Sequence, residues 1–195
     1  MTPRTKPATT RAATIPSPRP LVVFHRFRLG VPCEGYLLVE ECPHAIPLAD
    51  AVRSLATLDP DEQFRILTIW VNSLGRMLRL MHDRGMAHGD CKAANVLVSC
   101  IDSDPMAWLP TFIDLVGASS ALQIGWSKRH RDLARLAMSF LPSPQVTNSH
   151  RLRFLRTYFA TVPRLNRNWK PHWIAIERLI RAKVKRNVRR NRPLG

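Results

Sequence analysis

Apolar and polar positions follow a helical period most clearly over residues 59–85. Asp59 suits the N-cap, Pro60 suits the first helical position, and Glu62 completes a start of the capping-box type. Gly85 suits the left-handed position that follows a last helical turn. The apolar stripe recurs at three- and four-residue spacing at Phe64, Leu67, Val71, Leu74, Leu78 and Met81. The pattern predicts one long helix whose stripe belongs to a core.

Short apolar runs of strand type surround this helix in the sequence. Residues 21–27 and 36–41 are separated by a segment with Gly and Pro, which predicts an antiparallel hairpin with its turn within 28–35. Residues 46–58 predict a short helix. Two further strands are expected at 95–100 and 111–116, joined by an acidic loop at 101–110.

The rest of the chain is patterned as amphipathic helices. They are expected at 129–141, 150–162 and 172–190. The last of them places one apolar face among basic residues, made of Trp173, Ile176, Ile180, Val184 and Val188. The elements together predict an α+β protein that is mainly helical in its C-terminal part.

Charge divides the chain into two unequal parts. The net charge is +16, yet residues 1–150 hold 16 Lys and Arg against 13 Asp and Glu, whereas residues 151–195 hold 14 against Glu177 alone. Such a basic segment favours phosphate groups, either of nucleic acid or of an anionic membrane or glycolipid surface. Nucleic acid is not expected, because basic and aromatic residues are not interleaved and no recognition-helix signature occurs.

The ends of the chain and its cysteines favour a cytoplasmic protein. Residues 1–20 are rich in Pro, Thr and basic residues and predict a flexible arm, with no apolar segment of secretory type. No apolar run is long enough for a transmembrane helix. The four cysteines match no zinc or redox motif and are expected to be free thiols: Cys33, Cys42, Cys91 and Cys100.

The segment "HGDCKAAN", residues 88–95, carries the candidate chemistry. Transfer of the γ-phosphoryl group of ATP needs a carboxylate to orient the attacking hydroxyl, oxygen ligands for Mg²⁺, and a cation near the transferred group. Asp90, Asn95 and Lys92 supply these within six residues. Asp114, in "FIDLVG", adds a carboxylate from a separate segment.

These motifs resemble the protein-kinase-like superfamily, with "HGDCKAAN" similar to its catalytic loop and "IDLVG" to its metal-binding motif. The finer resemblance, over about residues 15–160, is to the lipopolysaccharide core kinases, which phosphorylate Kdo or heptose. It rests also on "IPSPRPLVVF", "GYLLVEE", "RDLARLAMSF" and "SHRLRFLRTYF". The resemblance implies a protein-kinase-like fold, an ATP-dependent phosphotransferase activity, and a place on the cytoplasmic face of the membrane.

The resemblance also implies roles for single residues. Asp90 would be the catalytic base and Lys92 would contact the γ-phosphate. Asn95 and Asp114 would bind Mg²⁺, and Glu40 and Glu41 would flank the adenine of ATP. Two further residues have structural roles in this interpretation: Asp132 would fix the catalytic loop, and His88 would pack beneath it.

One departure from the family pattern concerns the N-terminal lobe. A glycine-rich loop and a strand lysine are not found, since Lys6 precedes Pro7. We therefore expect residues 1–20 to be the arm, 21–41 a remnant of the N-terminal lobe with its hinge, 42–165 the helical C-terminal lobe, and 166–195 a basic amphipathic helix and tail. Three explanations of this departure stay open: a start assigned to an internal Met, a truncated gene, or a protein that works without the usual clamping of ATP. The alternative to an active sugar kinase is a catalytically impaired pseudokinase or truncated kinase remnant that binds an anionic partner through its basic tail.

Overall fold

The long helix α2 (Pro60–Asp83) organises the part of the chain that the computed structural model describes, which is residues 15–100, 108–160 and 168–191. The Asp59 side chain accepts hydrogen bonds from the backbone N–H groups of Asp61 and Glu62, so the predicted N-cap is confirmed. Gly85 has φ +73° just after the helix, as predicted. The predicted stripe is wrong at one end, because Phe64 is 39% exposed while Trp70 is buried.

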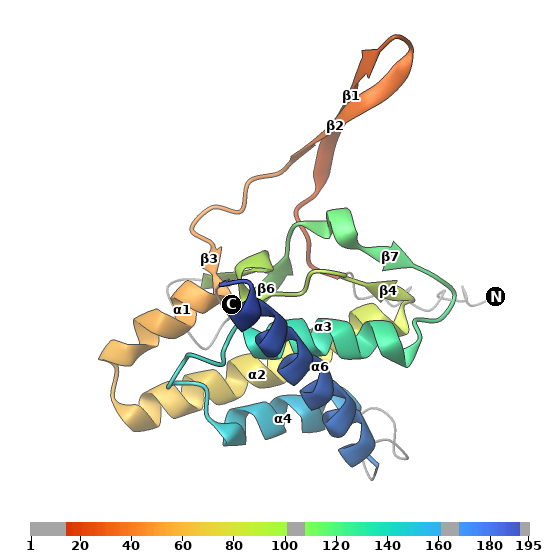
Figure 1. Cartoon of the computed structure of the whole chain (residues 1–195). Coiled ribbons are helices and arrows are strands. Elements are labelled where there is room, and N and C mark those ends of the chain that lie inside the picture. The colour runs from red at the N-terminus through yellow and green to blue at the C-terminus, as the bar shows by residue number, and fades with distance from the viewer. Residues whose placement is uncertain (1–14, 101–107, 161–167, 192–195) are drawn as a thin grey trace, which may run out of the picture.

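Three further helices and a short one pack around α2. The segments α1 (Leu48–Ser54), α3 (Trp126–Met138), α4 (Asn148–Phe159) and α6 (Lys170–Arg189) form the lobe (Figure 1). Helix α4 lies close along α2 at Gly75, where an added Cβ would be 3.0 Å from the carbonyl oxygen of Phe154. The absence of a side chain at residue 75 is what allows this approach.

A small antiparallel sheet packs against α2 near Trp70. Its strand order is β3 (Ile46–Pro47), β5 (Val96–Cys100) and β6 (Trp108–Phe112). The last strand was expected at 111–116, and its earlier position is a correction. Pro110 is tolerated because β6 is the outer strand of the three, and alternation buries Trp108 and Phe112, with Trp108 stacked on Trp70 at a centroid distance of 5.2 Å.

Two short strands frame the segment that carries the candidate chemistry. Strand β4 (Met86–Ala87) follows α2 and pairs antiparallel with β7 (Ser119–Ser120). Between them in the chain lie the 3₁₀ turns η2 (Ala93–Asn95) and η4 (Leu115–Gly117). The end of α2, the loop after β4 and the turn after β6 are therefore held in one region.

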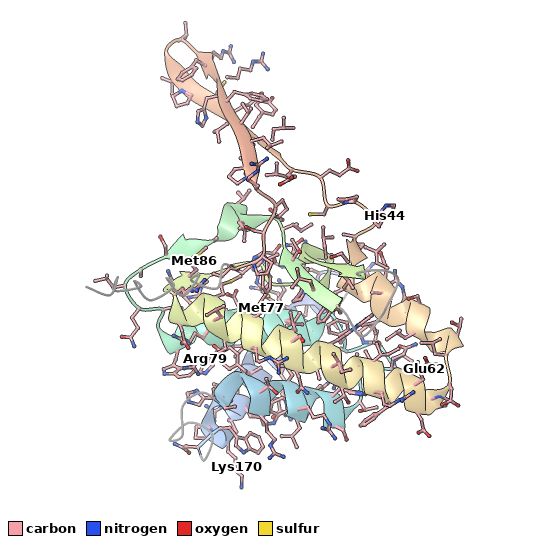
Figure 2. The ribbon with its side chains drawn as sticks, turned by 180° about the vertical axis from the view of Figure 1, so that it is seen from behind. His44, Glu62, Met77, Arg79, Met86 and Lys170 are labelled. Carbon is pink, nitrogen blue, oxygen red and sulfur yellow. The ribbon has the colours of Figure 1, made fainter. Side chains whose placement is uncertain are left out.

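The hairpin of β1 (Pro20–Arg28) and β2 (Val31–Val39) projects from the lobe (Figures 1 and 2). The predicted turn over 28–35 was too long: Leu29 and Gly30, both with positive φ, connect strands that continue to the tip. Every residue of the two strands is exposed. Before the hairpin, the Pro16 carbonyl accepts a hydrogen bond from Phe112 N–H at 2.9 Å, so this part of the predicted arm contacts β6.

Helix α6 turns its apolar side toward the lobe. Ile176 is buried, and Trp173 and Ile180 pack against the core beside α3. Val188 is 67% exposed, so the predicted apolar face does not continue to the end of the helix. Across residues 15–100, 108–160 and 168–191, no helix has the length and hydropathy that a membrane crossing requires.

Candidate active site

The loop after β4 is fixed from below by Asp132 of α3. Its carboxylate accepts the backbone N–H of His88 at 2.7 Å and that of Gly89 at 2.9 Å, and it is fully buried. Gly89 has φ +80°, and an added Cβ there would lie 2.1 Å from the carbonyl oxygen of Gly117. Glycine is therefore required at the bend that presents Asp90.

A second contact of α3 holds the far side of the same loop. The hydroxyl of Ser139 accepts the backbone N–H of Ala93 at 3.0 Å. Between the two contacts, the Arg135 guanidinium donates to Oδ1 of Asp90. Asp132 and Arg135 of α3 and its C-cap Ser139 follow one another at spacings of three and four, so they lie on one face of this helix.

The predicted metal-binding and catalytic residues meet at this loop. The Asn95 side-chain amide lies 2.9 Å from the Asp90 carbonyl oxygen, 3.4 Å from Asp90 Oδ2 and 3.4 Å from Asp114 Oδ2. Ile113 N–H donates to the carbonyl oxygen of Asn95 at 3.0 Å, which fixes the end of β6 against η2. Asp114 itself has φ +58°, a conformation that turns the chain sharply after the strand.

Lys92 lies at the open side of the same group. Its ammonium nitrogen is 3.4 Å from Asp90 Oδ2, and its side chain is 45% exposed, against 32% for Asp90. Asp90, Lys92, Asn95 and Asp114 thus form one cluster, the loop cluster. Two carboxylates, an amide and an ammonium group that lie together at an accessible surface form a polar set suited to phosphate and metal chemistry.

Glu40 and Glu41 lie elsewhere, in the segment between the hairpin and β3. Glu40 pairs with Arg19 at 3.5 Å, and its backbone N–H donates to the Arg19 carbonyl. Both residues are exposed. Among the described residues, no hydrogen bond or ion pair joins either of them to the loop cluster, and their proximity to adenine stays a prediction.

A buried network supports Asp132 from the side of α2. The ring nitrogens of His82 lie 2.5 Å from the Tyr158 hydroxyl and 3.2 Å from Asp132 Oδ2. Burial lowers the pKa of His82, although its hydrogen bond and charge interaction with Asp132 oppose this. Burial raises the pKa of Tyr158 to about 12, so its hydroxyl stays protonated. A neutral imidazole can then donate to Asp132 and accept from Tyr158.

His88 and Cys91 are buried beneath the loop. The His88 ring meets the edge of Phe112 at a centroid distance of 5.9 Å, and neither ring nitrogen has a hydrogen-bond partner among the described residues. The loop is therefore held by the backbone of His88, while its side chain packs. Burial raises the pKa of the Cys91 thiol well above its ordinary value, which makes it a packed residue and not a nucleophile.

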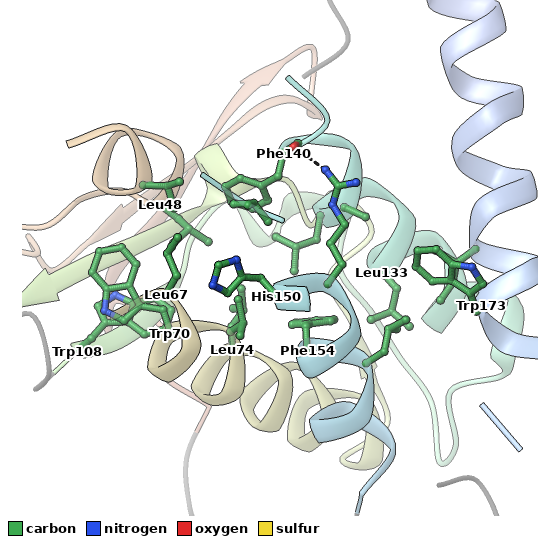
Figure 3. A pocket seen from close by; sticks show the side chains of 18 residues that line it. Leu48, Leu67, Trp70, Leu74, Trp108, Leu133, Phe140, His150, Phe154 and Trp173 are labelled. Carbon is green, nitrogen blue, oxygen red and sulfur yellow. Dashed lines mark hydrogen bonds between the residues drawn. The ribbon is translucent and has the colours of Figure 1, made fainter. Parts of the chain in front are cut away.

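An apolar cavity of about 80 Å³ lies between the helices of the lobe, and Figure 3 shows the side chains that line it. Leu133 and Leu136 of α3 line it, together with side chains from α1, α2, α4 and α6. None of the loop cluster residues reaches it. Its lining is mostly apolar and is suited to packing.

The sequence analysis does not predict Arg135 and Ser139 as residues of the site. The segment 129–141 has an amphipathic pattern, in which basic and hydroxyl positions are ordinarily solvated. The spacing of Asp132, Arg135 and Ser139 was the available signal, because residues three and seven positions after a residue that fixes the loop lie on the same helical face.

Known proteins are similar to this chain over most of its length. A family model described as "Lipopolysaccharide kinase (Kdo/WaaP) family" matches residues 9–158. Two curated relatives are named 3-deoxy-D-manno-octulosonic acid kinase: one from Photobacterium profundum, 32% identical over 133 residues, and one from Haemophilus influenzae, 30% identical over 129 residues. These alignments cover 68% and 66% of this chain but 49% and 48% of the relatives, so the chain spans about half of their length.

A solved structure shares the fold. The structure titled "WaaP in complex with acyl carrier protein" matches with a TM-score of 0.68 at 23% sequence identity, covering 84% of this chain and 68% of that chain. The match confirms the predicted α+β, protein-kinase-like fold.

Proposed function

Since the chain belongs to the lipopolysaccharide kinase (Kdo/WaaP) family, we propose that it is an ATP-dependent phosphotransferase acting on a sugar hydroxyl of lipopolysaccharide core, of Kdo or heptose. The observation that supports this most directly is the convergence of Asp90, Asn95 and Asp114 within hydrogen-bond distance. The proposal rests on this geometry together with the curated relatives, which are kinases of such a sugar acid.

The proposed reaction uses Asp90 and Lys92 directly. Asp90 orients the acceptor hydroxyl and receives its proton as the oxygen bonds to the γ-phosphorus, while the bond from that phosphorus to the bridging oxygen of ADP breaks. Lys92, beside Asp90 and half-exposed, places its charge near the transferred group. Glu40 and Glu41 would lie beside the adenine, as the resemblance implies.

Asn95 and Asp114 would hold Mg²⁺. The amide NH₂ of Asn95 faces Asp90 and Asp114, which leaves its side-chain oxygen and the second Asp114 oxygen as ligands. Within the described residues no group of three or more His, Cys, Asp or Glu side chains could hold a metal. Two protein oxygens are a small set, which suits Mg²⁺ because this ion usually keeps waters and shares nucleotide phosphates. The bound ion would neutralise charge on the phosphates.

Binding and transfer assays test the proposal. Asp114→Asn should weaken Mg·ATP binding by at least about tenfold, and Asp90→Asn should lower phosphate transfer by roughly 10²–10⁴-fold, as loss of a general base does. Asp50→Asn is the matched control, because this carboxylate lies outside the loop cluster and, among the described residues, pairs with Arg53 alone. Mg·ATP binding that Asp114→Asn leaves unchanged would refute the assignment.

The second candidate function is that of a catalytically impaired kinase that binds an anionic partner. The exposed cations of α6 favour it: Arg178, Arg181, Lys185, Arg186, Arg189 and Arg190. Nucleotide binding without transfer to any sugar, together with salt-sensitive binding to an anionic partner, would favour this alternative. Transfer that depends on Asp90 would exclude it.

We propose that the same surface of α6 attaches the protein to the cytoplasmic face of an anionic membrane. Trp173, Ile176 and Ile180 face the lobe, so attachment would be chiefly electrostatic. Each cation near an anionic bilayer contributes about 1 kcal/mol, and salt screens this contribution.

Vesicle cosedimentation tests the attachment. Reversing Arg178, Lys185, Arg186 and Arg189 to Glu should abolish binding to anionic vesicles, and salt should weaken wild-type binding steeply. The matched control reverses four exposed cations of α1 and α2 and the residue after α2, namely Arg53, Arg65, Arg76 and Arg84. Equal loss in both variants would show a general charge effect, and binding to neutral vesicles would refute the proposal.

A further inference from the structure

The Asp90 carboxylate is engaged by cations on both of its oxygens. Arg135 donates to Oδ1, while Lys92 lies 3.4 Å from Oδ2. The Asn95 amide also approaches Oδ2. A carboxylate oxygen has two lone pairs, so Oδ2 is fully engaged while Oδ1 has one contact, and an acceptor hydroxyl would approach Oδ1 beside Arg135 or in its place.

Arg135 differs from its neighbours on the same face of α3. Asp132 and Ser139 bind backbone N–H groups of the loop, and Asp132 is fully buried. The Arg135 side chain is 43% exposed and contacts a side chain that takes part in the proposed reaction. Because the two backbone contacts fix α3 on either side, Arg135 is held beside Asp90 without itself being needed to hold the loop.

The two cations have different uses once substrates bind. In the proposed function the charge of Lys92 is directed to the γ-phosphate. The Arg135 guanidinium has five N–H donors in a planar fork, and Asp90 is its only hydrogen-bond partner among the described residues. A planar fork matches a carboxylate in a two-point hydrogen bond better than a point charge does.

We infer that Arg135 binds a carboxylate of the acceptor sugar, beside the hydroxyl that Asp90 orients. In this arrangement the guanidinium moves from Asp90 to the acceptor, which frees Oδ1 for the hydroxyl. Arg135 is then a specificity-determining residue that selects a sugar acid over a neutral sugar, and of the two proposed acceptors it selects Kdo over heptose. This inference rests on the proposed function and adds the residue that recognises the carboxylate of the acceptor.

A binding matrix tests the inference on the 195-residue chain. Titrations followed by NMR compare 3-deoxy-D-manno-octulosonic acid with its methyl ester, which keeps the hydroxyls and lacks the negative charge. The wild-type chain should bind the acid about tenfold more tightly than the ester. Arg135→Gln should reduce this ratio to about two or less, and Arg135→Lys should give an intermediate ratio, because it keeps the charge and loses the fork.

Arg131→Gln is the matched control. Arg131 lies one turn earlier on α3 and is exposed, and within the described part of the chain its side chain donates hydrogen bonds to Ser127 alone. It should keep the wild-type ratio, which separates local recognition from attraction of any anion to a chain with net charge +16. Equal weakening of acid and ester in Arg135→Gln, or loss of the ratio in Arg131→Gln, would overturn the inference.

The proposed function and this inference fail in different measurements. If Asp114→Asn leaves Mg·ATP binding unchanged, the phosphotransferase assignment is refuted. A wild-type chain that binds Mg·ATP through Asp114 but prefers the acid no more than the ester overturns the role of Arg135 alone. Circular dichroism of each variant verifies that the exposed substitutions leave the fold intact.

Discussion

At the residue scale, Gly89 shows how closely the loop is packed against the turn after β6. With φ +80°, an L-residue at this position would be strained by about 1–2 kcal/mol. The added Cβ would also lie 2.1 Å from the carbonyl oxygen of Gly117, which is backbone and cannot rotate away. The loop and the turn after β6 would therefore have to separate, and Asp90 and Asp114 lie on the two sides of this contact.

We predict that Gly89→Ala lowers the free energy of unfolding by more than about 2 kcal/mol, as strain and clash add. Urea unfolding followed by tryptophan fluorescence measures this. Gly30→Ala is the control, because Gly30 has φ +79° but open space around its Cβ position. A loss no larger in Gly89→Ala than in Gly30→Ala would show that the close contact with Gly117 has no energetic weight.

One buried carboxylate, that of Asp132, holds the loop after β4. It accepts two backbone N–H groups and faces His82. Asp132→Asn would replace one acceptor oxygen by an NH₂ group that opposes a donor, and hydrogen bonds to charged groups contribute about 1.5–3 kcal/mol each. We predict a loss of roughly 2–4 kcal/mol in urea unfolding, whereas Asp50→Asn at the surface should change it by less than about 1 kcal/mol.

At the element scale, a pair of histidines joins α3 to α6. His130 and His172 lie with their ring nitrogens 2.9 Å apart, and Trp126 and Phe159 contact the His172 ring. Burial lowers the pKa of both residues, and the neighbouring His172 lowers that of His130 further. Two positive rings at this distance would repel each other, so the packing of α6 on α3 favours their neutral forms.

The sign of the pH dependence follows from these shifts. The unfolded chain takes up protons on both residues as the pH falls through about 6.5, before the folded chain does. Their contribution to stability is therefore complete above that pH and is lost progressively below it, down to the folded pKa values. We predict that His172→Phe, which keeps an aromatic ring, makes the loss of stability between about pH 6.5 and 5 shallower.

Urea unfolding at a series of pH values measures this slope. Near about pH 7.5 the variant should match the wild type within about 1 kcal/mol, which serves as its internal control. A parallel shift of the whole curve, with an unchanged slope, would show that the pair does not couple the helices to pH.

The elements that the sequence predicted well are those with strong local signals. Asp59 and Pro60 at the start of α2, and Gly85 with its positive φ after the end, are local signals that can be read from the sequence without knowledge of the tertiary contacts. The sequence predicts the start of β6 three residues late because Pro110 indicates a loop, and only the sheet order shows that Pro110 lies on an outer strand. Phe64 continues the apolar period but lies at the exposed edge, where Arg153 is 5.6 Å from its ring.

At the scale of the whole molecule, some residues of the candidate site could be predicted from the sequence and others could not. Asp90, Lys92 and Asn95 are close in the chain, so one motif predicts that they meet. Asp114 could be added because the resemblance supplied its partner motif. The spacing from Asp132 could place Arg135 on the face of α3 toward the loop, but its contact with Asp90 could not be predicted, since it depends on where α3 crosses the loop.

The hairpin is the other feature that belongs to the whole molecule. Its two faces both carry apolar residues, among them Phe24 stacked on Tyr36, and all of its strand residues are exposed. The core of the described chain is formed by other elements. Strands that are apolar on both faces are usually covered on both faces, and an exposed edge strand of this kind favours association.

We therefore predict that the hairpin contributes little to the stability of the lobe but governs self-association. Replacing residues 21–38 by a short Gly-Ser linker should change the free energy of unfolding by less than about 1 kcal/mol, because few packed groups are lost. All five tryptophans lie outside this segment, so their fluorescence reports the lobe alone. Light scattering at rising concentration should show association of the wild type and its loss in the variant.

A second variant keeps the hairpin but removes apolar side chains, so it tests the contribution of the apolar faces separately from that of the backbone. Changing Val23, Leu37 and Phe27 to Thr keeps strand propensity and removes apolar area that is 59–61% exposed. It should reduce association nearly as far as the deletion does, since burial of this area is the driving force. If the deletion instead lowers the stability of the lobe by several kcal/mol, the hairpin is an integral part of the lobe. If both variants associate like the wild type, the exposed faces of the hairpin are not the surface through which copies meet.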